Sequence, residues 1–296
     1  MVKIHHHNNS HVPVLLERVL DVLAPKPGES YLDLTAGYGG HASKILESVR
    51  DATKITLVDR DENAIKALGS LQDSGSRLIH QDFATAAQDL QAANEQFDMI
   101  LLDLGVSSPH RDNAERGFSF QSEAPLDMRM NQRQDITAAT IINTYSEAEL
   151  SRILKEYGEE PRAKRIAHAL VQQRPLQTTL ELAQLVEALY GRRGRTHPAT
   201  RTFQALRIAV NDELNQLTQT LERLPDLLSP QGRVAVISFH SLEDRLVKRF
   251  FAEQIADGYE AVLQLITKKP IQGAHEDVLN PRSRSAKLRA AVKINI

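Results

Sequence analysis

The segment Tyr31-Leu32-Asp33-Leu34-Thr35-Ala36-Gly37-Tyr38-Gly39-Gly40-His41-Ala42 joins a short apolar run to a glycine-rich loop. The run predicts a buried strand over 31–34, and a helix is expected from about His41 to Glu47. Glycine lets the backbone turn tightly and approach a ligand without a clashing Cβ, and the start of a helix offers unpaired N–H groups. The segment therefore predicts a strand–loop–helix unit of the nucleotide-binding type.

Strand and helix signals alternate on both sides of this segment. The strands are expected at 31–34, 54–58, 77–80, 97–102, 234–239, 261–267 and 288–294. The helices are expected at 14–23, 41–47, 63–71, 163–172, 180–190 and 242–255, with others starting at the capping box Ser146-Glu147-Ala148-Glu149 and near Pro198. Such alternation implies a parallel sheet with helices on both faces. The last two strands have only the polar, loop-like stretch 268–287 between them, so an antiparallel pair is expected at the sheet edge.

The alternation is interrupted after the fourth strand. Residues 105–133 show no period and are rich in Ser, Pro, Gly, Asp and Arg, and a loop of this length is usually functional. A helical block of about one hundred residues follows, and its last helix is expected to continue from Pro198 to Leu224. We therefore expect a doubly wound α/β domain at 1–112 and 212–296, with an inserted all-α domain at 113–211.

Composition sets limits on the class of protein. The chain has 296 residues, a net charge of −2, 41% hydrophobic residues and no Cys, so disulfides, thiolate metal sites and a cysteine nucleophile are excluded. No stretch approaches the roughly 20 apolar residues of a membrane span, and the polar, histidine-containing segment 1–11 is not a signal peptide. These features fit a cytoplasmic protein.

Asp59 follows the second strand, 20 positions after Gly39 (59 − 39 = 20). A carboxylate at that place can accept hydrogen bonds from both hydroxyls of an adenosine ribose. Gly37, Gly39 and Ala42 also fit the dinucleotide pattern G-x-G-x-x-G/A, so a nicotinamide cofactor stays open. S-adenosylmethionine, with one ribose and no pyrophosphate, fits equally well, and a tight turn without any ligand is the remaining alternative.

Two further residues end strands at the same predicted rim. Asp103 closes the fourth strand, where it either binds an amine or only caps a turn. His240 follows the fifth strand, where it is a base, a substrate donor or a structural group. No Ser lies in a G-x-S-x-G elbow, which disfavours a serine hydrolase, and no His or acid pair has convincing metal-ligand spacing, so no metal is expected.

Basic residues gather in two stretches that contain no acid. The first holds Arg192, Arg193, Arg195, Arg201 and Arg207, and the second holds Arg282, Arg284, Lys287, Arg289 and Lys293. Such clusters bind a phosphate backbone or form a solvated face. The low aromatic content argues against a base-stacking platform.

Several long motifs, in order along nearly the whole chain, resemble those of the small-subunit ribosomal RNA methyltransferase H family, also called MraW. They are His11-Val12-Pro13-Val14-Leu15-Leu16, residues 35–41, Asp59-Arg60-Asp61, residues 102–109, Arg116-Gly117-Phe118-Ser119-Phe120, residues 125–130, residues 197–205 and residues 238–245. The resemblance implies a class I S-adenosylmethionine-dependent methyltransferase with a helical insert. It also implies methyl transfer to N4 of a cytidine in the decoding centre of 16S ribosomal RNA, within the small subunit, by a monomer or homodimer.

The resemblance implies the cofactor contacts, and the chemistry and charge pattern suggest the other roles. The cofactor contacts implied by the resemblance are Gly39, Gly40, His41, Asp59, Phe83, Asp103 and His110, and the glycine loop adds Gly37. Asp103, Ser107 and Ser108 are the expected catalytic residues. Arg192, Arg193, Arg201 and His240 are expected to bind the RNA substrate. His110 departs from the family pattern, in which Gln is expected, and its charge depends on pH.

Three alternatives stay open at this point. The chain methylates another substrate such as protein or DNA, it is a nicotinamide-dependent oxidoreductase, or it is a non-enzymatic ribosome-assembly factor that keeps a cofactor pocket. Cofactor binding and methyl incorporation discriminate among them.

Overall fold

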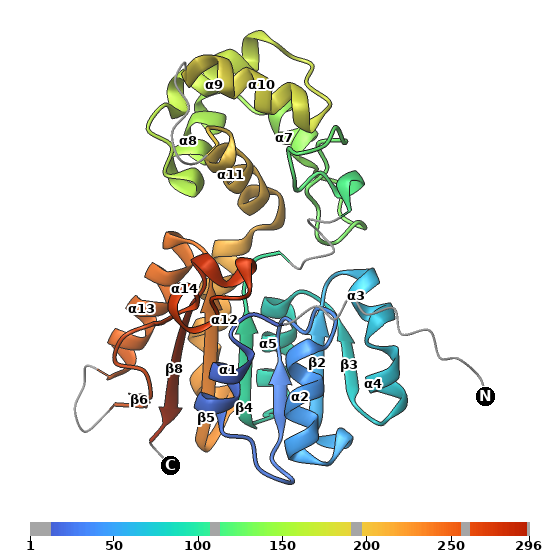
Figure 1. Cartoon of the computed structure of the whole chain (residues 1–296), viewed down its shortest axis with the longest axis vertical. Coiled ribbons are helices and arrows are strands. Elements are labelled where there is room, and N and C mark those ends of the chain that lie inside the picture. The colour runs from blue at the N-terminus through green and yellow to red at the C-terminus, as the bar shows by residue number, and fades with distance from the viewer. Residues whose placement is uncertain (1–12, 107–112, 191–196, 256–260, 295–296) are drawn as a thin grey trace. The chain divides into compact units, whose positions relative to one another are not determined.

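The computed structural model describes residues 13–106, 113–190, 197–255 and 261–294. Figure 1 traces the chain. It divides into two compact units: unit 1 consists of 1–59, 63–104 and 220–296, and unit 2 consists of 60–62 and 105–219. Each unit has its own apolar core. Within the described ranges, no helix is both long and apolar enough to cross a membrane.

One twisted sheet organises unit 1. Its strands are β1 (Tyr31–Asp33), β2 (Ile55–Asp59), β3 (Arg77–His80), β4 (Phe97–Asp103), β5 (Leu228–Ser238), β6 (Leu263–Leu265), β7 (Ile271–Gln272) and β8 (Lys287–Lys293). The order is β3-β2-β1-β4-β5-β8-β6, and β7 pairs with β8. Neighbours from β3 to β5 are parallel, whereas β8 is antiparallel to both β5 and β6. The predicted parallel sheet and antiparallel edge pair are confirmed, and the last strand lies inside the sheet.

Helices cover both faces of this sheet. They are α1 (Leu16–Leu23), α2 (Gly40–Val49), α3 (Glu62–Ala67), α4 (Gly69–Asp73), α5 (Phe83–Ala92), α13 (Ser241–Ile255) and α14 (Gly273–Glu276). In Figure 1, α1 and α2 lie in front of the strands and α5 lies behind them. Tyr31, Leu57 and Leu101 point toward α1 and α2, because alternate residues of a strand face opposite sides.

Two predictions for unit 1 are wrong in detail. The single helix expected over 63–71 is two short helices, since Leu68 separates α3 from α4 and Gly69 disfavours a helix interior. The stretch 268–287, expected as loop, contains β7, α14 and the 3-10 helix Pro281–Ser285.

Unit 2 is a bundle of helices. They are α7 (Ala138–Thr144), α8 (Glu147–Gly158), α9 (Ala163–Gln172), α10 (Thr179–Tyr190) and α11 (Thr200–Asn211), followed by α12 (Glu213–Leu227), which continues into unit 1. The predicted capping box at Ser146 and Glu149 is confirmed. The single helix expected to run to Leu224 is wrong, because Asp212 takes a left-handed conformation (φ 51°) that ends α11 before α12 begins.

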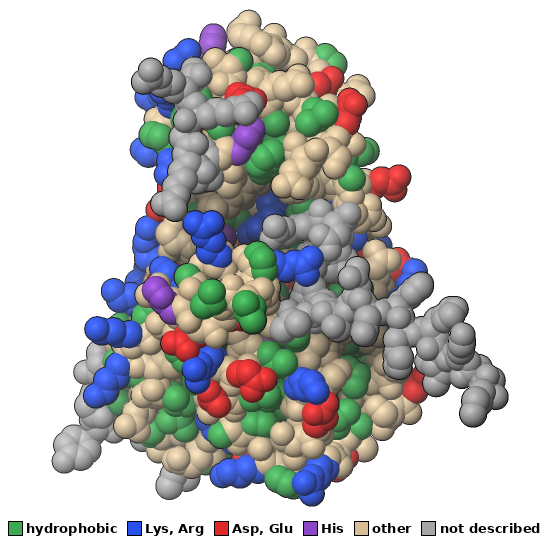
Figure 2. Space-filling model, in the orientation of Figure 1, with side chains coloured by type: hydrophobic (Ala, Val, Ile, Leu, Met, Phe, Trp, Pro, Cys, Tyr) green, Lys and Arg blue, Asp and Glu red, His purple; other side chains and the backbone are tan. Residues whose placement is uncertain are grey.

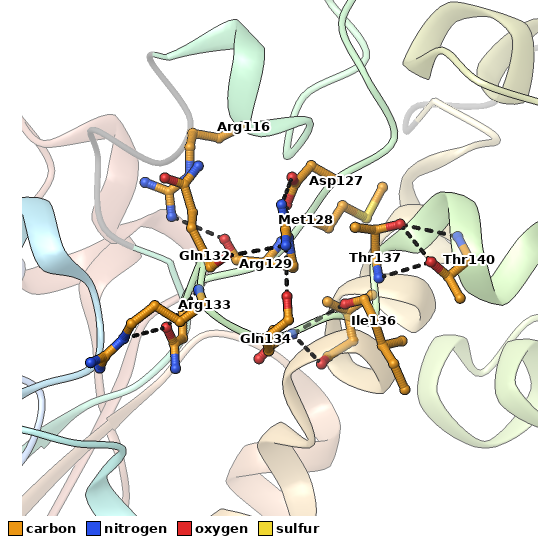
Figure 3. Close-up of polar contacts among 12 residues, drawn as sticks. Arg116, Asp127, Met128, Arg129, Gln132, Arg133, Gln134, Ile136, Thr137 and Thr140 are labelled. Carbon is orange, nitrogen blue, oxygen red and sulfur yellow. Dashed lines mark hydrogen bonds and ion pairs between the residues drawn. The ribbon is translucent and has the colours of Figure 1, made fainter.

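The polar segment 113–137, which precedes α7, is held by hydrogen bonds and ion pairs (Figure 3). Arg116 is 4% exposed; its guanidinium lies 3.3 Å from the Asp61 carboxylate and donates to the carbonyl oxygens of Arg129 and Met130 at 3.0 Å. Arg129 in turn pairs with Asp127 at 2.7 Å. These arginines are therefore part of the framework of unit 2, which explains how a segment without periodic apolar residues keeps one conformation.

Candidate active site

The site lies at the carboxyl ends of the parallel strands in unit 1. β1 has β2 on one side and β4 on the other, so the chain order reverses between β1 and β4. Open α/β sheets bind ligands at such a reversal, because the loops after the two strands leave toward opposite faces. The backbone N–H of Asp103 donates to Thr35 Oγ1 at 2.6 Å and joins these two loops.

The glycine loop is anchored to the next strand. Asp59 ends β2, and its carboxylate accepts the Gly37 N–H at 2.8 Å. Gly39 precedes α2 with φ 77°, a left-handed conformation that glycine adopts without strain. Gly40 and His41 form the first turn of α2, where backbone N–H groups are available to a ligand. The structure therefore brings Gly37, Gly39, Gly40 and Asp59 together.

His41 connects the glycine loop with β4. Its ring is buried, and Nε2 donates to the Val14 carbonyl oxygen at 3.0 Å. A carbonyl oxygen can only accept a hydrogen bond, so this contact places a proton on Nε2. Nδ1 lies 3.8 Å from Asp103 Oδ2. His41 thus lies between the N-terminal segment and the β4 carboxylate.

A second carboxylate, which the sequence pattern did not single out, ends β1, the strand beside β4. Asp33 is 1% exposed and accepts hydrogen bonds from the Tyr31 hydroxyl at 2.8 Å and the Thr35 N–H at 3.1 Å. Burial raises the pKa of Asp33 to about 7, although these hydrogen bonds act in the opposite direction. The signal was present in the sequence, since Asp33 interrupts an otherwise apolar strand.

The Asp103 carboxylate has a raised pKa and one oxygen without a hydrogen-bond donor among the described residues. Burial, followed by the nearby carboxylates of Asp33 and Glu243, holds the pKa of Asp103 well above its usual range. Its Oδ1 is enclosed and accepts no hydrogen bond from any residue in the described part of the chain. Enclosed oxygens normally have a donor, so the unpartnered Oδ1 marks Asp103 as a candidate ligand-binding group.

His240 lies at the same rim, between β5 and α13. Glu243 is buried, and its Oε2 accepts the N–H groups of Phe239 at 2.7 Å and His240 at 3.2 Å. Oε1 of Glu243 lies 3.2 Å from His240 Nε2, but the contact lacks hydrogen-bond geometry. Glu243 therefore fixes the turn that carries His240, a role that its position in the sequence did not reveal.

The remaining predicted site residues have different placements. Phe83 is the half-buried first residue of α5, directly after Asp82, which caps that helix. Arg201 belongs to unit 2, where it donates to the Glu159 carbonyl oxygen at 3.1 Å. Ser107, Ser108, His110, Arg192 and Arg193 lie outside the described residues.

The donors and acceptors of unit 1 fit S-adenosylmethionine. An anchored acid follows β2, backbone N–H groups open α2, and an enclosed carboxylate oxygen without a donor among the described residues ends β4. With the parallel sheet and the antiparallel β8, these features define a class I S-adenosylmethionine-dependent methyltransferase.

The sequence matches a known family over almost its entire length. The profile of the MraW methylase family matches residues 8–294, and the chain therefore belongs to this family. A relative from Cyanothece sp., named "Ribosomal RNA small subunit methyltransferase H", is 50% identical over 96% of this chain and 95% of its own length. A relative of the same name from Heliobacterium mobile is 47% identical over 96% of this chain and 99% of its own.

Asp33 predicts a specific dependence of stability on pH. Its pKa is higher in the folded than in the unfolded chain, so its contribution is full at low pH and is lost as pH rises toward 7. Asp33→Asn keeps an acceptor for Thr35 but does not titrate. Between pH 5 and pH 8, we expect the free energy of unfolding of the variant to rise by on the order of 2 kcal/mol relative to that of the wild type.

Urea unfolding at the two pH values measures this gain. Asp51→Asn is the control, because hydrogen bonds from Thr53 lower the pKa of Asp51 and move its titration below this window. Parallel pH profiles of Asp33→Asn and the wild type would show that Asp33 does not titrate there.

Proposed function

We propose that this methyltransferase transfers a methyl group to N4 of a cytidine in the decoding centre of 16S ribosomal RNA, within the small ribosomal subunit. The name shared by relatives with 47–50% identity over 96% of the chain supports a small-subunit ribosomal RNA substrate. The observation that carries the choice of an amine is the enclosed Asp103 Oδ1 without a donor among the described residues, because an exocyclic NH2 supplies such a donor.

Asp103 orients the acceptor amine in this proposal. Bound S-adenosylmethionine supplies an electrophilic methyl on a sulfonium, so the chain needs no nucleophile of its own. Cytosine N4 is a weak nucleophile because its lone pair is delocalised into the ring. Accepting an N–H of N4 at Asp103 Oδ1 localises that pair, and the same carboxylate then receives the proton, while the hydroxyls of Ser107 and Ser108 accept hydrogen bonds from the amine.

Unit 2 holds the surrounding RNA in this proposal. Arg192, Arg193 and Arg201 contact phosphates, while His240 contacts the target nucleotide from unit 1. Not every arginine of the first basic stretch is available, since Arg207 pairs with Glu213 at 2.8 Å. The target cytidine leaves its stack to reach the β4 carboxylate, as bases do in other enzymes that modify them.

Labelled methyl transfer tests the proposed reaction. The protein is incubated with methyl-labelled S-adenosylmethionine and small ribosomal subunits from cells that lack this enzyme, and the RNA is digested to nucleosides. We expect the label in N4-methylcytidine. Label in another nucleoside or in protein would overturn the substrate, and binding of a nicotinamide cofactor without any label would overturn the reaction class.

Asp103→Asn separates a catalytic role of Asp103 from a role in cofactor affinity. We expect kcat to fall about 10²-fold or more, because the amide is a weaker acceptor and cannot receive the proton. The Kd for S-adenosylmethionine, measured by calorimetry, should stay within about threefold of the wild type.

Asp98→Asn is the matched control for Asp103→Asn. Asp98 lies at the opposite end of β4 and accepts hydrogen bonds from Ser30. A large rise in Kd for Asp103→Asn, with kcat preserved at saturating cofactor, would assign Asp103 to the cofactor instead of the amine.

Charge reversal tests the arginines of unit 2. We expect Arg192→Glu with Arg193→Glu to weaken binding of small subunits and to leave the Kd for cofactor unchanged, because RNA phosphates repel the new carboxylates. Arg152→Glu with Lys155→Glu, on the exposed face of α8, is the matched control. Loss of cofactor binding in the first variant would contradict the division of roles between the units.

A further inference from the structure

Two adjacent apolar side chains stand in solvent on a turn of unit 1. Val278 is 72% exposed and Leu279 is 97% exposed, the highest values among the large hydrophobic residues that the structure describes. They lie between α14 and the 3-10 helix Pro281–Ser285. Single exposed apolar residues are common on protein surfaces. This pair is unusual because the turn that carries it is fixed by hydrogen bonds and close packing.

Asp277 forms the base of this turn. Its Oδ2 accepts the Leu15 backbone N–H at 3.0 Å, the Asn280 side-chain N–H at 3.3 Å and the Ser283 hydroxyl. Asn280 in turn accepts the Arg282 N–H at 3.2 Å. One carboxylate therefore ties both sides of the turn to the start of α1, 262 residues earlier in the chain.

Close packing fixes the turn further. The Gly273 N–H donates to the Ala286 carbonyl at 2.9 Å, which closes the base of the segment. A Cβ at Gly273 would stand 2.0 Å from the backbone oxygen of Ser283, so only glycine allows α14 and the 3-10 helix to approach this closely. The turn is thus a rigid support with an apolar tip.

The turn stands at the same rim as the candidate active site. β8 begins at Lys287, which pairs with Ser238 at the carboxyl end of β5, and Ile237 pairs with Asp103. Figure 1 shows α14 at the edge of the sheet where β8 begins. The segment Val14–Leu15 also connects the two features, since Val14 accepts from His41 and Leu15 donates to Asp277.

Charge around the tip favours a polyanion. Residues 278–294 contain no acid. Lys287 and Arg289 of this stretch are paired with Asp244, at 2.9 and 2.7 Å. Arg284 is exposed and forms no ion pair with any residue of the described segments. Figure 2 shows both acidic and basic side chains on the visible face, so this face does not carry a general basic coat.

We propose that the turn Asp277–Ser285 is an RNA-binding element of unit 1, which inserts Leu279 and Val278 between or against bases and binds a phosphate with Arg284. The proposal rests on the proposed RNA substrate. Apolar side chains that enter nucleic acids act as wedges between bases, and a rigid support lets them do so without an ordering cost. The turn therefore holds the RNA next to the rim at which the target base is bound.

Two variants separate the apolar contact from the phosphate contact. Binding of small subunits is measured over a range of salt concentrations, together with the Kd for S-adenosylmethionine. We expect Val278→Ser with Leu279→Ser to weaken subunit binding about tenfold with an unchanged salt dependence. We expect Arg284→Gln to reduce the slope of log K against log salt by about one, as the loss of one phosphate contact does.

The controls are Ile266→Ser and Arg249→Gln, which change one exposed apolar and one exposed basic residue elsewhere in unit 1. All variants should keep the wild-type melting temperature and cofactor Kd. Subunit affinities and salt slopes equal to those of the controls would overturn the proposal. Absence of methyl transfer by the wild-type protein would instead overturn the proposed function, so the two failures are distinguishable.

Discussion

The hydrogen bond from the Asp103 N–H to Thr35 Oγ1, 2.6 Å long, joins the two loops at which the strand order of unit 1 reverses. The loop after β1 carries the glycines, and the end of β4 carries the carboxylate. Their separation therefore depends on this bond and on the register that pairs Asp33 with Leu101. The bond from Gly37 to Asp59 extends the same constraint to β2. A ligand at this rim meets groups that are already positioned, which reduces the entropy lost on binding.

The electrostatics of the site follow from the same placement. Asp33 and Asp103 end adjacent strands, and the buried Asp33 carboxylate raises the cost of ionising the half-buried Asp103. His41 Nδ1, 3.8 Å from Asp103, is the nearest potential counter-charge among the described contacts of that carboxylate. A site of this kind favours ligands that bring either a positive charge or N–H donors. In the proposed function the N–H donor is the exocyclic amine of the target base.

Much of this arrangement could be predicted from local patterns. Apolar runs that end in Asp59 and Asp103 identified the strands and their rim, because strand burial and chain reversal leave a strong signal in the sequence. The division of 198–224 into α11 and α12 could not be predicted, since apolar residues continue at helical spacing across Asp212, and only the left-handed backbone there ends the helix. Contacts between distant residues were equally hidden: nothing local indicates that Asp277 accepts from Leu15.

The N-terminal segment shows how one short stretch can couple two surfaces. Val14 accepts the His41 ring N–H, and Leu15 donates to Asp277, so neighbouring residues contact the glycine loop and the turn with the exposed Leu279. With both present, a shift of the turn must also move Val14 relative to α2, against the buried ring of His41. Such a connection keeps the proposed RNA contact at a fixed distance from the cofactor loop, as the proposed alignment of amine, methyl and sulfur requires.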